Sequence, residues 1–340
     1  NSLPARIPEN LSPCSSTLQG GPMDLISLDY PDGISTIDTG YLRPGFDASH
    51  LIVEGGKAAF VDVGTTLAVP LLLEALRERC IARDQVTHVL VTHVHLDHAG
   101  GAGALLQELP EARLVVHPRG ARHLIDPARL IEGTIAVYGA SRFRELYGEV
   151  VPVPEDRVVI AEDEWTLDFH GRPFLFLDTP GHARHHYCMI DRRTHSLFSG
   201  DNFGIAYREL HTPNGPFIFP TTTPVQFEPD QMHATLERLM LYTPTSAYLT
   251  HFGRVDSLDA LAADLHWRLD QFLEAADAVR HLKDNRQPLL AKKIREILHQ
   301  EYRRHGGTLP DAELDAVLQF DYELNAQGIE VWLQREESAA

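Results

Sequence analysis

The sequence predicts an α/β fold, with a mixed α/β domain over residues 23–253 and a helical extension over 254–340. Two observations predict it. From Met23 onward, short apolar segments rich in β-branched residues alternate with segments of helical spacing. Beyond Gly253 the strand-like segments stop, and long helical segments follow. A third observation bears on function: several predicted strands end directly in His or Asp beside Gly, as in a site built from loops at a sheet edge.

The first half of the α/β domain is predicted to consist of strands that alternate with helices. The apolar segment 57–63 ends at Gly64, which favours a turn after a buried strand. The expected elements are strands at 57–63, 86–92 and 113–117, helices at 69–80 and 96–106, and a helical insert over about 120–147.

The second half contains a predicted β-hairpin and a long loop. Residues 186–190 and 195–199 flank a polar turn, which is typical of a hairpin. Residues 203–229 are rich in Pro, Phe and Thr without periodicity, and a loop of this length in a compact domain is usually functional. The remaining elements are strands at 157–160, 173–178 and 246–250 and a helix at 228–242.

The C-terminal extension reads as three helices, at 257–283, 287–304 and 310–326. Leu261, Leu265 and Leu269 recur at helical spacing, which indicates a face packed against the main domain. These helices could cap the site or form the interface of a homo-oligomer.

Composition excludes some classes of partner. A formal net charge of -18 over 340 residues argues against nucleic acid, because phosphate binding requires clustered Lys and Arg. No apolar segment approaches the ~18 residues of a membrane span, so we expect no membrane association and a small-molecule substrate.

Cysteine content and the N-terminus bear on location. Three cysteines are too few and too scattered for a disulfide framework, which fits a reducing compartment. Residues 1–22 lack the basic start and apolar stretch of a secretory signal, so we interpret them as a tag or a disordered leader before Met23. Cytoplasmic localisation is the resulting expectation.

The strongest chemical signal is the segment Thr92–His98, which holds four potential metal ligands. His93 and His95 are two residues apart and project to the same side of an extended chain. Asp97 and His98 lie past the strand-to-helix turn, free to bind a neighbouring ion. Four ligating side chains this close together indicate a metal site.

Three further candidate ligands follow other strands. His182 follows the strand 173–178, Asp201 follows 195–199, and His251 follows 246–250. Each has a Gly at or near it, which relieves crowding. With the first four residues they supply enough ligands for two metal ions.

These motifs resemble those of the metallo-β-lactamase superfamily. The segment from His93 to His98 matches its H-x-H-x-D-H signature, and the later Thr-Pro-Gly-His, Gly-Asp and Thr-His segments match the remaining metal motifs in order. The stretch after Thr179 looks like that of the glyoxalase II branch. The resemblance covers about 23–253 and implies a four-layer αβ/βα sandwich with the metals at one edge between two sheets.

The resemblance also implies roles for these residues. His93, His95 and His182 would bind one ion, Asp97, His98 and His251 a second, and Asp201 would bridge them beside a hydroxide. Two divalent ions per chain are implied, zinc by preference, although His and carboxylate ligands suit iron and manganese as well. Asp97 would also be catalytic by orienting the nucleophile and passing its proton to the leaving group. Asp62 would support the ligand loops.

The implied activity is hydrolysis of an ester-like bond (thioester, lactone or carboxylic ester) by a metal-bridging hydroxide. A phosphodiesterase and an iron-dependent oxidoreductase that reacts with oxygen or persulfide are the alternatives, because the same ligands serve them. An intact ligand set argues against a non-catalytic sensor.

Other residues are assigned by position. His186 opens a strand, so we expect a structural hydrogen bond beside the site. Phe203, Tyr207 and His211 follow Asp201 and are candidates for the wall of a substrate pocket. Tyr138 and Tyr147 in the helical insert are weaker candidates for the same wall.

Overall fold

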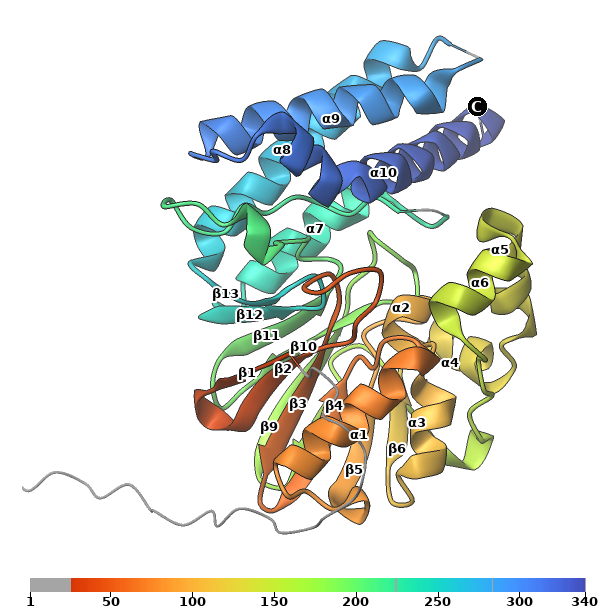
Figure 1. The fold of residues 1–340 in the computed structure, drawn as a ribbon, viewed down its shortest axis with the longest axis vertical. Helices are drawn as coiled ribbons and strands as arrows, with labels where there is room; N and C mark the ends of the chain where they lie inside the picture. Colours follow the sequence, from red (N-terminus) through yellow and green to blue (C-terminus); the bar gives the residue numbers. More distant parts are fainter. Residues whose placement is uncertain (1–25, 224, 283, 340) are drawn as a thin grey trace, which may run out of the picture.

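The structure is a computed structural model that describes residues 26–223, 225–282 and 284–339. The expected leader at 1–22 lies outside the described residues. Within them the chain forms two β-sheets, helices on both outer faces and a helical layer at one end (Figure 1).

The first sheet has seven strands in the order of the sequence. Neighbours from β1 to β4 are antiparallel, and those from β4 to β7 are parallel. The strands are β1 (Ser27–Tyr30), β2 (Ile34–Asp38), β3 (Ala48–Glu54), β4 (Lys57–Val61), β5 (Val86–Leu90), β6 (Arg113–Val116) and β7 (Val158–Ile160).

The second sheet has six strands in the order β13-β12-β11-β10-β9-β8. The predicted hairpin is confirmed as the antiparallel pair β10–β11, while β11 and β12 run parallel. The strands are β8 (Thr166–Phe169), β9 (Arg172–Asp178), β10 (Tyr187–Asp191), β11 (Ser196–Gly200), β12 (Ser246–Leu249) and β13 (Gly253–Asp256).

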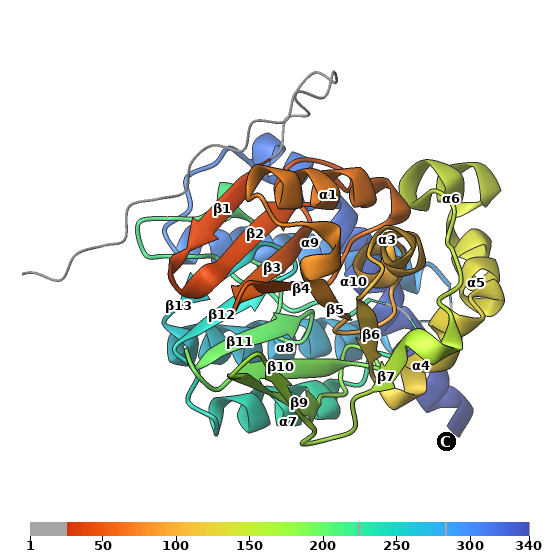
Figure 2. The same cartoon turned by 90° about the horizontal axis from the view of Figure 1, so that it is seen from below.

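Four layers are seen when the molecule is viewed from below (Figure 2). Helices α1 (Val69–Glu78) and α3 (Ala102–Glu108) cover the first sheet, and α7 (Pro229–Met240) and α8 (Leu258–Val279) cover the second. A buried apolar cluster that includes Val61, Leu90, Phe176 and Phe198 fills the space between the sheets. The αβ/βα sandwich implied by the resemblance is therefore confirmed.

The remaining helices are short and lie beside the sandwich. The predicted insert forms α4 (Pro118–Ile125), α5 (Ala128–Tyr138) and α6 (Ala140–Tyr147), and α2 (Leu96–Ala99) follows the metal motif. Short 3₁₀ turns lie at Pro31–Gly33, Thr66–Ala68, Arg83–Gln85, Glu155–Arg157 and Arg208–Leu210. Residues 203–223 and 225–228 belong to the predicted long loop, in which the backbones of Ile205 and Phe219 form a β-bridge.

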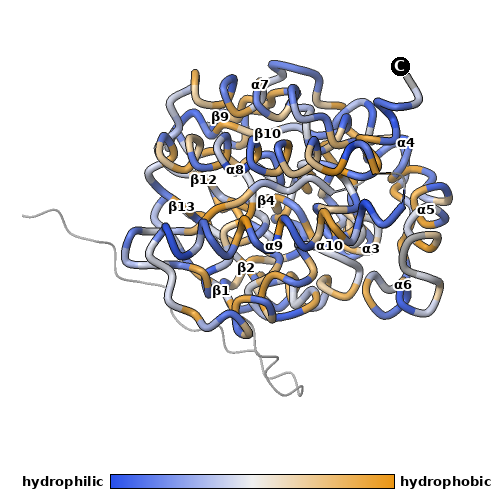
Figure 3. Tube along the Cα trace, turned by 90° about the horizontal axis from the view of Figure 1, so that it is seen from above, coloured by the Kyte–Doolittle hydropathy of each residue, from blue (hydrophilic) through white to orange (hydrophobic). Residues whose placement is uncertain are grey.

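Helices α8, α9 (Arg286–Arg304) and α10 (Asp311–Ala339) form the layer above the sandwich (Figure 1). Along α9 and α10, hydrophobic and hydrophilic residues alternate as expected for helices with one buried face (Figure 3). Leu290, Ile294 and Leu298 of α9 join Leu314 and Leu318 of α10 in one buried cluster with loop 203–229. No helix in the described part of the chain is long and apolar enough to cross a membrane.

Two features differ from the prediction. Helix α10 runs to Ala339, whereas the expected helix ends at 326. Strands β1, β2, β3, β8 and β13 were not predicted. In β2 all five residues are buried, polar Ser35, Thr36 and Asp38 among them, so its sequence lacks the alternation that marks a half-buried strand.

Candidate metal centre

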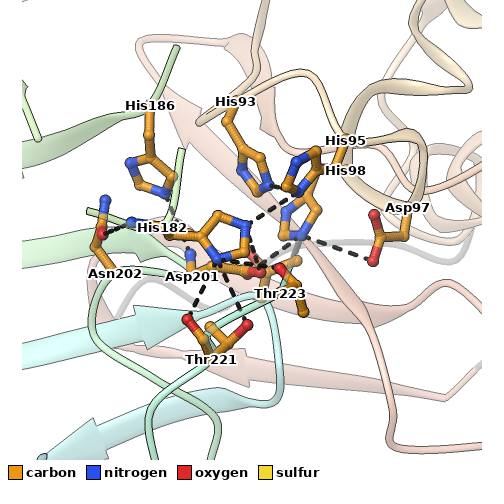
Figure 4. A network of polar contacts seen from close by, with 12 residues as sticks. His93, His95, Asp97, His98, His182, His186, Asp201, Asn202, Thr221 and Thr223 are labelled. Atoms are coloured by element: carbon orange, nitrogen blue, oxygen red, sulfur yellow. Dashed lines mark hydrogen bonds and ion pairs between the residues drawn. The ribbon is translucent and has the colours of Figure 1, made fainter. Parts of the chain in front are cut away.

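The candidate ligands converge where strands of both sheets end (Figure 4). His93, His95, Asp97 and His98 lie in the turn after β5 and in α2, and His182, Asp201 and His251 follow β9, β11 and β12. Residues distant in sequence therefore come together because the carboxyl ends of these strands share one edge of the sandwich. Five of the seven residues are buried, His95 is partly buried, and the side chain of Asp97 is 25% exposed.

The first group of ligand atoms consists of three imidazoles. Nδ1 of His95 lies 2.9 Å from Nε2 of His93 and 3.0 Å from Nε2 of His182. Their ligand atoms lie within 4.8 Å of one another, close enough to bind one ion. Nitrogens brought this close by two chain segments that are distant in sequence are expected around a tetrahedral metal site.

The second group consists of Asp97, His98 and His251, whose ligand atoms also lie within 4.8 Å of one another. Oδ2 of Asp97 lies 3.9 Å from Nε2 of His98 and 3.8 Å from Nε2 of His251. These separations leave room for an ion between the side chains.

Asp201 lies between the two groups. Its Oδ1 is 3.2 Å from Nε2 of His98, and its Oδ2 is 3.4 Å from Nε2 of His182. Oδ1 of Asp201 and Nε2 of His98 are both buried and have no hydrogen-bond partner in the described part of the chain. Buried polar atoms without partners are costly, and a cation between the groups would satisfy both.

Burial and neighbouring charges set the protonation states of the candidate ligands. Burial lowers the pKa of His93 and His95 well below the usual value, so both imidazoles are neutral and have free lone pairs near neutral pH. Burial alone would also lower the pKa of His98, but the carboxylates of Asp201 and Asp97 outweigh it and raise that pKa well above its usual value. Burial would raise the pKa of Asp201, yet the surrounding imidazoles hold it well below its usual range.

Asp62 supports the ligand turn from beneath. It follows β4 with a positive φ of 50°. Its Oδ1 accepts a hydrogen bond from the backbone N of Thr92 at 2.8 Å, and its Oδ2 lies 2.9 Å from Nδ1 of His98 and 2.8 Å from the Thr250 hydroxyl. Because Asp62 accepts the Nδ1 proton of His98, Nε2 of that ring faces the centre, where a bound cation would take the place of its proton.

His186 is buried and holds the backbone near Asp201. Its Nδ1 lies 3.0 Å from the Thr179 hydroxyl, and its Nε2 accepts a hydrogen bond from the backbone N of Asp201 at 3.2 Å. Both ring nitrogens are thereby engaged, so His186 acts as a structural support for a ligand. Nδ1 of His251 similarly contacts the backbone O of Phe46 at 2.8 Å, which leaves Nε2 to face the centre.

The donor set fits two divalent ions. It contains neutral imidazoles and carboxylates in two overlapping groups, with one carboxylate, Asp201, between them. Nitrogen and oxygen donors of this kind suit zinc, iron and manganese.

A cavity of about 410 Å³ opens on this centre. Asp97, Asp201, His95 and His251 form its polar floor, and helices α5 and α10 contribute to its walls. His185, three residues after the candidate ligand His182, is buried and lines the cavity as well.

The pocket prediction is partly wrong. Tyr207 lines the cavity, as does Tyr147. Phe203 instead packs into the apolar cluster between the second sheet and α8, because its side chain points away from the metal centre into that core. His211 follows a 3₁₀ turn, is exposed and does not line the cavity in the described part of the chain. The side chain of Tyr138 lies outside the described residues.

Sequence reasoning missed the contribution of α10 to this cavity. Phe320, Asp321, Leu324 and Asn325 line it, although they lie more than a hundred residues after Asp201. Asp321 and Asn325 are polar residues on the buried face of an otherwise amphipathic helix. This irregularity is a signal that could have pointed to them.

Comparisons with known proteins agree with this architecture. A family model described as the metallo-beta-lactamase superfamily matches residues 42–286. A metallo-beta-lactamase fold-containing protein of Sulfurisphaera tokodaii is 28% identical over 176 residues, which cover 51% of this chain and 62% of that protein. A hydroxyacylglutathione hydrolase of Xylella fastidiosa is 29% identical over 199 residues, which cover 58% of this chain and 56% of that enzyme. The matches thus span less than two thirds of either relative.

A solved structure supports the fold. A metallo-beta-lactamase family protein from Thermus thermophilus superposes with a TM-score of 0.64 at 20% identity, over 90% of this chain and 94% of that one. Since the family model covers most of the chain and the sandwich holds the superfamily's ligand motifs at the expected edge, the chain belongs to the metallo-beta-lactamase superfamily.

Proposed function

We propose that this protein is a binuclear metal-dependent hydrolase of ester-like bonds, with zinc as the preferred metal. The observation that carries the proposal is the position of Asp201 between two groups of three ligands, with its oxygens 3.2 and 3.4 Å from His98 and His182. Two bound ions would supply a hydroxide nucleophile near pH 7 and polarise the scissile carbonyl.

Asp97 is suited to proton transfer. It lines the cavity, and its side chain is 25% exposed. A carboxylate beside both the second ligand group and the substrate space can orient the attacking water and return the proton to the leaving group. Asp62 and His186 keep the ligands in place and do not touch the substrate.

The cavity favours an acyl substrate. Its walls are largely aromatic and aliphatic, with Tyr41, Phe46, Ile205 and Leu324 among the lining residues. A wall of this kind binds an acyl chain or ring by excluding water. Similarity to a hydroxyacylglutathione hydrolase also points to a thioester, and we place lactones and carboxylic esters in the same test.

The test combines metal analysis with activity. We expect close to two zinc ions per chain in the purified protein and hydrolysis of at least one member of a panel of thioesters, lactones and carboxylic esters. His95→Ala or Asp201→Ala should abolish this activity with little change in helical content. The matched control is His211→Ala, because His211 is exposed and away from the cavity.

Two results would overturn the proposal. Full activity in either ligand variant would exclude the metal-dependent mechanism. Iron in place of zinc, with oxygen consumption and no hydrolysis, would move the protein to oxidative chemistry.

A further inference from the structure

The cavity has a second polar region, which the C-terminal helix provides. Asp321 and Asn325, one turn apart on α10, line it together with Tyr207 of loop 203–229. Their neighbours on the same helix, Phe320 and Leu324, are apolar. A few polar groups in an apolar wall commonly determine the orientation and specificity of a ligand.

Asp321 is buried, and only one of its two carboxylate oxygens has a hydrogen-bond partner among the described residues. The residue is 3% exposed, and its Oδ1 accepts a hydrogen bond from the Tyr207 hydroxyl at 3.1 Å. Its Oδ2 has no hydrogen-bond partner in the described part of the chain. Burial raises the pKa of Asp321 to about 7, against the opposing effects of Tyr207 and Arg43. A buried carboxylate oxygen without a partner is costly, so a protein rarely keeps one without a use.

Asn325 does not satisfy this oxygen. Its Oδ1 accepts hydrogen bonds from the backbone N of Thr222 at 2.6 Å and from the Thr222 hydroxyl at 2.9 Å. Its Nδ2 donates to the backbone O of Asp321 at 2.9 Å. Asn325 therefore fixes α10 against the loop and makes no hydrogen bond to Oδ2 of Asp321.

Arg43 is a cation whose charge acts on Asp321, but it does not satisfy the oxygen either. Its guanidinium lies 4.5 Å from the centre of the Tyr207 ring, and its Nη1 donates to Glu209 and to the backbone O of Pro44. Its Nη2 is likewise without a partner among the described residues, and Arg43 is not part of the cavity wall. The charge of Arg43 favours the ionised carboxylate, but no hydrogen bond joins the two side chains.

We propose that Oδ2 of Asp321 is the recognition group for a hydrogen-bond donor, an O–H or N–H group, on the part of the substrate remote from the scissile bond. The proposal rests on the proposed hydrolase function and narrows its substrates to ester-like compounds that carry such a donor. Tyr207 holds the carboxylate in place from the other side, and α10 thus acts as a specificity element.

The test compares donors with non-donors of similar size and polarity. Two series of thioesters carry a terminal hydroxyl or a terminal methoxy group on chains of increasing length, one series on the acyl chain and one on the leaving thiol. A methoxy oxygen accepts a hydrogen bond but cannot donate one. In at least one series, assayed at alkaline pH where Asp321 is ionised, we expect kcat/KM to favour the hydroxyl compound by about 10- to 100-fold, as for one hydrogen bond to a charged group.

The decisive variant is Asp321→Asn. Asparagine keeps an oxygen for Tyr207 but presents an amide N–H₂ to the cavity, which can donate to either compound. The hydroxyl-to-methoxy ratio should therefore fall to within about twofold of one. The matched control is Asp315→Asn on the same helix, where the carboxylate pairs with Arg295 outside the cavity. This variant should keep the wild-type ratio.

A binding measurement separates this proposal from the hydrolase function. Calorimetry with the hydroxyl- and methoxy-terminated product acids or thiols reports recognition even if no thioester is cleaved. Preference for the hydroxyl compound without hydrolysis would support the Asp321 site and count against the proposed function. Two results would overturn the Asp321 site. One is hydrolysis by the wild-type protein with a hydroxyl-to-methoxy ratio near one at every chain length. The other is a ratio that Asp321→Asn leaves unchanged.

Discussion

At the scale of the residue, Asp62 connects three segments that carry ligands. Its two oxygens contact the backbone N of Thr92, Nδ1 of His98 and the hydroxyl of Thr250, and it is fully buried. Thr92 and Thr250 directly precede His93 and His251. One carboxylate therefore positions the start of the ligand turn, one ring and the end of a strand of the second sheet.

We expect Asp62→Asn to weaken metal binding by about 10- to 100-fold, because an amide cannot accept from both His98 and the threonines as a carboxylate does. A competition titration with a chromophoric chelator measures this affinity. Asp84→Asn is the control, because Asp84 is exposed and lies in the turn before β5, at the opposite end of that strand from the ligands. Wild-type affinity in the Asp62 variant would show that Asp62 is not needed to orient the ligands.

At the scale of the element, α10 packs closely on the segment that lines the cavity. Gly328 is buried in the helix, and a Cβ at this position would overlap the carbonyl oxygen of Thr222. The same segment is held by Asn325 through Thr222. Gly at this position is thus explained by the short distance between the helix and the loop.

Gly328→Ala should therefore destabilise the protein by about 1–3 kcal/mol, the usual cost of overpacking. The sign of this change in unfolding free energy is informative, because replacing Gly by Ala in an open helix interior stabilises a protein by about 1 kcal/mol. Gly133→Ala in α5 provides that comparison, since nothing lies within 4 Å of its added Cβ. Urea unfolding measures both changes. An increase in stability for Gly328→Ala would mean that α10 does not approach Thr222 this closely.

The sequence predicted local features of the site better than distant ones. His93 to His98 form one short turn, so their pattern alone indicates a metal site, and His182, Asp201 and His251 follow recognisable strands. The role of Asp321 depends on how α10 docks more than a hundred residues later, which no local pattern encodes. Phe203 illustrates the same limit, because its position beside Asp201 in sequence says nothing about which side of the strand end it faces.

Element boundaries show a related limit. The expected end of the last helix at 326 fell just before Gly328, which lowers helix propensity. Tertiary packing overrides this effect, because Ile329 and Leu333 are buried in the cluster that joins α8, α9, α10 and the long loop. The strand β2 was missed because burial on both faces removes alternation of polar and apolar residues.

At the scale of the whole molecule, the two sheets supply the metal ligands and the helical layer completes the cavity. The sandwich edge provides histidines and aspartates from both sheets, while α5 and α10 provide walls. The site contains many buried imidazoles, and a buried imidazole without its metal resists protonation. The free energy of unfolding of the metal-free protein must then depend on pH.

We expect the stability of the metal-free protein to fall as the pH decreases from 7.5 to 5.5. Burial lowers the pKa of His93, His95 and His186 well below 6.5, and that of His50 to about 4. The unfolded chain therefore binds more protons as the pH passes through 6.5, and each such group contributes about 1.4 kcal/mol per pH unit below that value.

Groups whose pKa is raised in the folded state stabilise the protein as the pH falls, but they are fewer than the histidines with lowered pKa values. Burial raises the pKa of Asp47 and Asp321, and nearby carboxylates, against the effect of burial, raise that of His98. The folded state therefore holds protons at these three sites, which stabilises it as the pH falls. Buried histidines with lowered values outnumber them, so the net effect of acid is destabilising.

Urea unfolding of chelator-treated protein across this pH range measures the dependence. His50→Gln serves as the internal check, because His50 is buried away from the candidate ligands, between the Thr36 hydroxyl and the backbone O of Leu249. Removing this one imidazole should reduce the slope by about 1.4 kcal/mol per pH unit, since one proton-binding site disappears from the unfolded chain. Stability that stays constant or increases towards pH 5.5 would mean that the imidazoles are not held neutral in the metal-free fold.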